Sequence, residues 1–67
     1  MVAAYIGLGA NLGDPAQAVR EAIAQLSRLP QTTLVRASSL YSSAPVDASG
    51  DDFVNAVALI DTGLAPQ

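Results

Sequence analysis

The chain has 67 residues, of which 51% are hydrophobic, so it forms one small domain at most and is not a disordered tail. It contains no cysteine and no histidine, which excludes a disulfide framework and a zinc site and leaves a missing remainder, a partner or self-association to stabilise it. Its three arginines and the absence of lysine give a formal net charge of −3, which excludes the clustered positive charge of a duplex-binding surface.

The first segment, residues 2–8, is apolar nearly throughout and ends at Gly9. A short, continuous apolar run closed by glycine predicts a central strand that is covered on both faces. No basic region precedes it, and no apolar run approaches the roughly 18 residues of a membrane span. We therefore expect a cytoplasmic protein without a signal peptide.

The second segment, residues 15–28, has the signals of a helix. Asp14 can cap its start, Pro15 suits its first position, and Gln17 completes a capping-box arrangement with Asp14. Apolar residues then recur at helical spacing until Pro30 ends the pattern: Val19, Ala22, Ile23, Leu26 and Leu29.

The second half of the chain predicts two strands joined by a long loop. Residues 32–43 are rich in β-branched and small side chains and predict one long strand, which the loop 44–52 follows. Residues 53–60 predict a strand with two apolar faces, which suggests cover on both sides. One face carries Phe53, Asn55, Val57 and Leu59, and the other carries Val54, Ala56, Ala58 and Ile60.

The order strand, helix, strand, strand predicts an α+β fold, the β-α-β-β start of a ferredoxin-like split β-α-β fold with an antiparallel-containing sheet and a helix on one face. Such a fold continues with a second helix and a fourth strand. Residues 62–67 resemble a turn into that helix, with Pro66 near its first position. We therefore expect residues 1–67 to be the N-terminal part of a single domain, truncated before the second helix and fourth strand. An ordinary C-terminus is the alternative.

Three groups of residues suggest chemistry but lack what it needs. The glycines from Gly7 to Gly13 do not fit a dinucleotide fingerprint, because position 12 is leucine; they make a tight turn or let a ligand approach the backbone. The loop acids read as a solvated loop rather than a metal site: Asp47, Asp51 and Asp52. The serines of residues 38–43 have no histidine or lysine to activate them.

Phe53 and Asn55 form a more informative pair, because they point the same way on one strand at the exit of a loop. An aromatic ring can stack on a flat heterocycle, and an asparagine amide supplies a donor and an acceptor that match the edge of a pterin or purine. Core packing of Phe53 is the alternative.

Three stretches, in order and with compatible gaps, cover nearly the whole chain: AYIGLGANLG (4–13), SSLYSSAP (38–45) and DFVNAV (52–57). They resemble three motifs of the 6-hydroxymethyl-7,8-dihydropterin pyrophosphokinase family: A-Y-[IL]-x-[LI]-G-S-N-[LM]-G, S-S-x-Y-x-T-x-P and [DP]-[FY]-x-N-x-[VA]. Ala10 stands where the family usually has serine, and Ser43 where it has threonine. The loop after Val46 also lacks a frequent glycine, which leaves the conformation of that loop open.

The resemblance implies a 2-amino-4-hydroxy-6-hydroxymethyldihydropteridine diphosphokinase, a transferase of folate biosynthesis. Such enzymes use ATP and Mg²⁺ to move the terminal diphosphate of ATP to a reduced pterin, with release of AMP. By resemblance, Phe53 stacks on the pterin and Asn55 bonds to its edge. Gly9 lies beside the hydroxymethyl group, and three loop positions line the pocket: Ser43, Ala44 and Val46.

The resemblance also implies that this chain lacks the catalytic parts. The family's magnesium ligands form a D-x-D pair in the second half of the protein, and no D-x-D occurs here. We therefore expect no catalytic or metal residue in this chain, no bound cofactor, no activity by the chain alone, and self-association through exposed strands. The alternative is a small ferredoxin-like ligand-binding or oligomerisation domain without catalysis.

Overall fold

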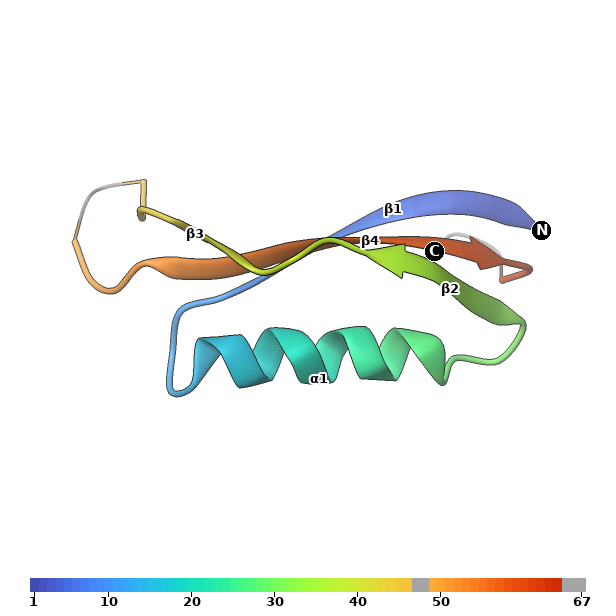
Figure 1. Ribbon diagram of the computed structural model, residues 1–67, viewed down its shortest axis with the longest axis horizontal. Coiled ribbons are helices and arrows are strands. Elements are labelled where there is room, and N and C mark those ends of the chain that lie inside the picture. Colours follow the sequence, from blue (N-terminus) through green and yellow to red (C-terminus); the bar gives the residue numbers. More distant parts are fainter. Residues whose placement is uncertain (47–48, 65–67) are drawn as a thin grey trace.

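The computed structural model describes residues 1–46 and 49–64. One helix packs on a four-stranded sheet (Figure 1). In chain order the elements are β1 (Val2–Ala10), α1 (Pro15–Ser27), β2 (Thr32–Ala37), β3 (Tyr41–Ser43) and β4 (Phe53–Thr62). This order confirms the α+β start of a ferredoxin-like fold.

Strand β4 lies at the centre of the sheet. It pairs antiparallel with β1 on one side and with β2 and β3 on the other. The prediction that residues 2–8 form the central strand is wrong for the described part of the chain, where β1 lies at the edge. Its residues alternate between exposed and half-buried, because only one of its faces meets the helix. The exposed face includes Ala3 and Gly7. Both residues are small, so the sequence does not indicate whether this face is buried or exposed.

Helix α1 begins at Pro15, as predicted, and ends at Ser27, one residue before the predicted end. The Asp14 Oδ1 atom accepts a hydrogen bond from the backbone N–H of Gln17 at 3.1 Å, and Pro15 occupies the first turn. Arg28 caps the end of the helix. None of the described helices has the length and apolar character that crossing a membrane requires.

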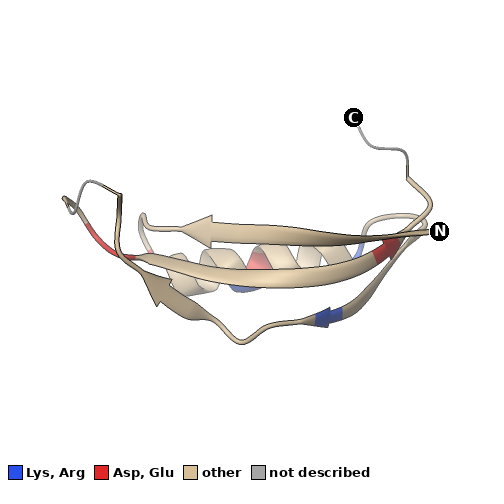
Figure 2. Cartoon of the chain, turned by 90° about the horizontal axis from the view of Figure 1, so that it is seen from above, with Lys and Arg blue, Asp and Glu red and all other residues tan. Residues whose placement is uncertain are grey.

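The core lies where α1 crosses the sheet. Its buried residues are Val19 of α1 and three residues of β4: Ala56, Ala58 and Ile60. The predicted alternation of β4 is confirmed, but the expected cover on both of its faces is wrong for the described residues. Figures 1 and 2 show α1 against one face of the sheet only. On the other face, the open face, Val57 is 36% exposed and Tyr5 is 74% exposed.

The single strand predicted over residues 32–43 is wrong, because the second of two irregularities in this stretch divides it into β2 and β3. The first is a register shift between Leu34 and Arg36, and the second is a break between β2 and β3. Both strands still pair with β4. The predicted loop after residue 43 is confirmed as the connection from β3 to β4.

The last strand is longer than predicted, since it was expected to end at Ile60. Strand β4 continues to Thr62, and the backbone N–H of Gly63 donates to the carbonyl of Gln31 at 2.8 Å. The rest of the predicted turn into a second helix, including Pro66, lies outside the described residues.

Candidate functional site

The sheet brings four of the predicted site residues together on its open face. Strand register places Gly9 of β1 opposite Asn55 of β4, and Ser43 of β3 opposite Phe53. Residues directly opposite one another in a sheet project to the same face. Three strands therefore converge at the end of the sheet where β4 begins.

The Asn55 amide is held by hydrogen bonds to β3. Its Nδ2 atom donates to the Ser43 Oγ atom at 2.7 Å and to the Tyr41 carbonyl at 3.4 Å. Both N–H groups of the amide are thus directed toward protein acceptors, and the Oδ1 atom accepts no hydrogen bond from the described residues. The sequence suggested that Asn55 offers a donor and an acceptor, whereas in the structure only the acceptor is free among the described residues.

Gly9 is needed for the close approach of β1 to this amide. A Cβ atom built at Gly9 would lie 3.0 Å from the Asn55 Oδ1 atom and 4.0 Å from the Phe53 Cδ1 atom. The free acceptor and the edge of the ring therefore both lie beside Gly9. The sequence left open whether this glycine makes a turn or lets a ligand approach the backbone. In the structure Gly9 lies within β1, and its missing side chain leaves room next to the amide.

The Phe53 ring is half-buried and lies away from the core under α1. It lines an open depression of about 520 Å³. Four other residues line it: Asn11, Pro45, Val46 and Ser49. This volume is in the range of small-molecule sites, roughly 300–1,000 Å³. The position of Phe53 excludes the alternative that its ring packs in the hydrophobic core beneath the helix.

The predicted loop residues Ala44 and Val46 differ in whether they line this depression. Val46 is fully exposed and lines the depression, whereas Ala44 is exposed and does not line it. The sequence reasoning missed Asn11 and Pro45 as lining residues. Both stand inside the motifs that carry the family resemblance, so their place in those motifs was the signal available.

The described residues bring together no group of metal-binding side chains. They contain no cluster of three or more His, Cys, Asp or Glu side chains. Asp51 and Asp52 are exposed, as expected for a solvated loop, and Asp47 lies outside the described residues. The one ion pair within the described ranges joins Arg28 to Glu21 at 3.2 Å on the helix surface. The arrangement places a half-buried aromatic ring near a free amide acceptor, which suits a flat molecule with a polar edge.

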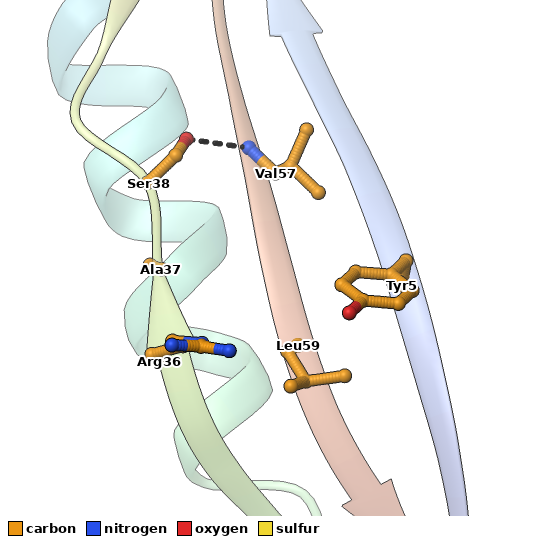
Figure 3. A pocket seen from close by; sticks show the side chains of 6 residues that line it. All are labelled: Tyr5, Arg36, Ala37, Ser38, Val57 and Leu59. Carbon is orange, nitrogen blue, oxygen red and sulfur yellow. Dashed lines mark hydrogen bonds between the residues drawn. The ribbon is translucent and has the colours of Figure 1, made fainter.

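A second depression of about 220 Å³ lies further along the open face (Figure 3). Its lining residues are Tyr5, Arg36, Ala37, Ser38, Val57 and Leu59. None of them lines the depression at Phe53, so the two are separate features of the same face.

The amino-acid sequence of the chain is similar to those of known proteins. Residues 5–67 match the model of a family described as 7,8-dihydro-6-hydroxymethylpterin-pyrophosphokinase. The chain is 45% identical over 65 residues to a 2-amino-4-hydroxy-6-hydroxymethyldihydropteridine pyrophosphokinase of Pseudomonas putida, which covers 97% of this chain and 54% of that protein. The protein of the same name from Haemophilus influenzae is 45% identical over 67 residues, which is 98% of this chain and 42% of that protein. The chain thus spans about half the length of the curated relatives it matches.

Proposed function

The chain belongs to the 7,8-dihydro-6-hydroxymethylpterin-pyrophosphokinase family, and from this we propose that it supplies part of the pterin site of a diphosphate transferase. The substrates of the whole enzyme are ATP and 6-hydroxymethyl-7,8-dihydropterin, and the products belong to folate biosynthesis. One observation carries the proposal: Phe53, Asn55 and Gly9 converge on the open face of the sheet.

The pterin lies flat against the Phe53 ring, where stacking and removal of apolar surface from water favour binding. Its amino and ring N–H groups donate to the Asn55 Oδ1 atom, because the other side of that amide is directed toward Ser43 and Tyr41. The absence of a side chain at Gly9 leaves space beside this acceptor. The Ser43 hydroxyl and the backbone of Ala44 and Val46 complete this side of the pocket.

Diphosphate transfer needs groups that the described residues do not provide. Phosphoryl transfer depends on positioning and on cationic and metal charge at the transferring group. The chain has no lysine and no D-x-D pair, and the described residues hold no acidic cluster for Mg²⁺. ATP and Mg²⁺ therefore belong to the whole enzyme, and this chain's own residues bind and orient the pterin.

The isolated chain is expected to bind the pterin without turning it over. Titration of the isotope-labelled chain with 6-hydroxymethyl-7,8-dihydropterin should shift the backbone NMR signals of the site residues and leave those of α1 in place. Mg²⁺ and ATP should shift neither set, and no AMP should form when all three are mixed with the chain.

The two halves of this experiment fail separately. Absence of shifts at Gly9, Phe53 and Asn55 up to the solubility of the pterin would contradict the pterin site. Formation of AMP that depends on both substrates would show that this chain carries out the transfer by itself. That result would contradict the proposal that the groups for phosphate chemistry lie in the rest of the enzyme.

The isolated chain is also expected to self-associate. Among the described residues, β1 has one partner, so its other edge is unpaired, and that edge carries no charge and no proline. An apolar depression of about 310 Å³ adjoins it, lined in part by Val2, Ala4 and Ile6. Unprotected edges and apolar patches favour pairing between chains. Sedimentation velocity should therefore give a dimer or larger species.

A charge on β1 provides the matched test of that association. Tyr5→Lys places a lysine on the edge strand and should shift the chain toward monomer. Leu12→Lys changes a similarly exposed apolar residue in the turn after β1 and should not. A folded monomer of the unaltered chain at high concentration would contradict the expectation.

The cytoplasmic location stays a prediction of the sequence.

A further inference from the structure

The break between β2 and β3 is a bulge of defined size. The backbone N–H of Ser38 donates to the Val57 carbonyl at 2.8 Å, so Ser38 still lies against Val57. Tyr41 pairs with Asn55 three residues later. Ser39 and Leu40 thus stand against Ala56 alone, which is the two-against-one arrangement of a β-bulge.

The Ser38 side chain takes the place of a backbone group at this bulge. Two residues that form a hydrogen-bonded antiparallel pair normally exchange two backbone bonds. Here the Val57 N–H donates to the Ser38 Oγ atom at 2.9 Å (Figure 3). The same hydroxyl donates to the Ser39 carbonyl at 2.9 Å. The hydroxyl therefore joins β4 to the first residue of the bulge.

The extra residue decides which way Ser43 points. A regular ladder continued from the Ala37–Ala58 pair would put Ser42 opposite Phe53 and turn Ser43 toward the face that α1 covers, because a shift of one residue moves every side chain to the other face. In the structure Ser43 is opposite Phe53, on the open face. Only there can its Oγ atom accept the 2.7 Å bond from the Asn55 amide.

We propose that the Ser38 hydroxyl is a positioning group for the pterin site. It holds the bulge of Ser39 and Leu40, and thereby the register that lays Ser43 beside Asn55 with the Oδ1 acceptor free. Ser38 does not line the depression at Phe53, so it acts through Ser43 and Asn55 rather than on the ligand. Its effect on ligand binding rests on the proposed function; its effect on the register does not.

The chain offers a matched set of variants for the test. Ser38→Ala removes the hydroxyl, Ser38→Thr keeps it, and Ser39→Ala removes the neighbouring hydroxyl, for which the described residues show no side-chain hydrogen bond. The readouts are hydrogen exchange of the Val57 amide, the side-chain NH₂ signals of Asn55, and the Kd for 6-hydroxymethyl-7,8-dihydropterin from NMR titration.

Ser38→Ala is expected to speed exchange of the Val57 amide about tenfold, the equivalent of one intramolecular hydrogen bond. It should also move the Asn55 NH₂ signals and raise the pterin Kd at least about fivefold, a loss within that of one hydrogen bond to the ligand. Ser38→Thr and Ser39→Ala should match the unaltered chain in all three readouts.

Unchanged Asn55 signals in a folded Ser38→Ala chain would overturn the proposal, even if the Val57 amide exchanged faster. If Ser38→Ala does not fold, Ser38→Thr decides: a folded threonine variant that loses Val57 protection or moves the Asn55 signals overturns the proposal, and one that keeps both supports it. Failure of the unaltered chain to bind the pterin would count against the proposed function alone, because the Val57 and Asn55 readouts need no ligand.

Discussion

Phe53→Ala is expected to weaken pterin binding by about 1–3 kcal/mol, roughly five- to 150-fold in Kd, which is the usual contribution of a ring stacked on an aromatic side chain. The Phe53 ring is half-buried on the open face and makes no part of the core under α1. Its removal should therefore cost more in binding than in folding. NMR titration of the variant measures the first, and thermal unfolding by circular dichroism measures the second.

Two further variants separate stacking from general loss of apolar surface. Phe53→Leu keeps an apolar side chain without a ring, and should lose most of the affinity that Phe53→Ala loses. Tyr5→Ala removes another aromatic ring from the same face, but one that lines the separate depression with Leu59. It should leave the pterin Kd within about twofold, as a surface change away from the site. Equal weakening by Tyr5→Ala and Phe53→Ala would contradict the assignment of the ring.

Gly9→Ala is expected to weaken pterin binding about tenfold, the value of one displaced hydrogen bond. The new Cβ atom would lie 3.0 Å from the Asn55 Oδ1 atom, which is closer than such atoms normally approach. The Asn55 Oδ1 atom must then shift by a few tenths of an ångström, which is expected to disturb the 2.7 Å bond from this amide to the Ser43 Oγ atom. The methyl group would also fill the space beside the acceptor that the ligand uses.

Gly7→Ala is the matched control on the same strand. A Cβ atom at Gly7 meets nothing within 4 Å, and the residue projects to the same open face two positions before Gly9. Because glycine is unfavourable inside a strand, Gly7→Ala should leave the pterin Kd unchanged and stabilise the chain slightly. Shifted Asn55 side-chain signals are expected in Gly9→Ala only. The same signals in both variants, with equal affinity, would show that the close approach at Gly9 has no part in binding.

The features that the sequence predicted correctly depend on near neighbours in the chain. The start of α1 follows from Asp14, Pro15 and Gln17, which lie within one turn of each other and form the observed cap. The alternation along β4 follows from the period of two that every strand has. The family resemblance came from three short motifs together, and the expectation that Phe53 and Asn55 share a face came from the same period of two.

The features that it missed depend on which distant segment lies opposite. Residues 32–43 have the composition of one strand throughout, and nothing in that composition marks the bulge at Ser39 and Leu40. Whether a residue is extra in a strand is defined only by the strand that pairs with it, here β4. The edge position of β1 and the open face of the sheet are likewise properties of the assembled sheet.

By itself, then, the amino-acid sequence determined the order of elements, the helix cap and the family, because local hydrogen bonds and short motifs encode them. The tertiary structure alone decided the direction of the Asn55 amide. That direction depends on a bond from Asn55 to Ser43, twelve positions earlier in the chain, and on the close approach of Gly9 from a third strand. A hydrogen bond between side chains needs both partners placed to within a few tenths of an ångström, and only the register of three strands supplies that placement.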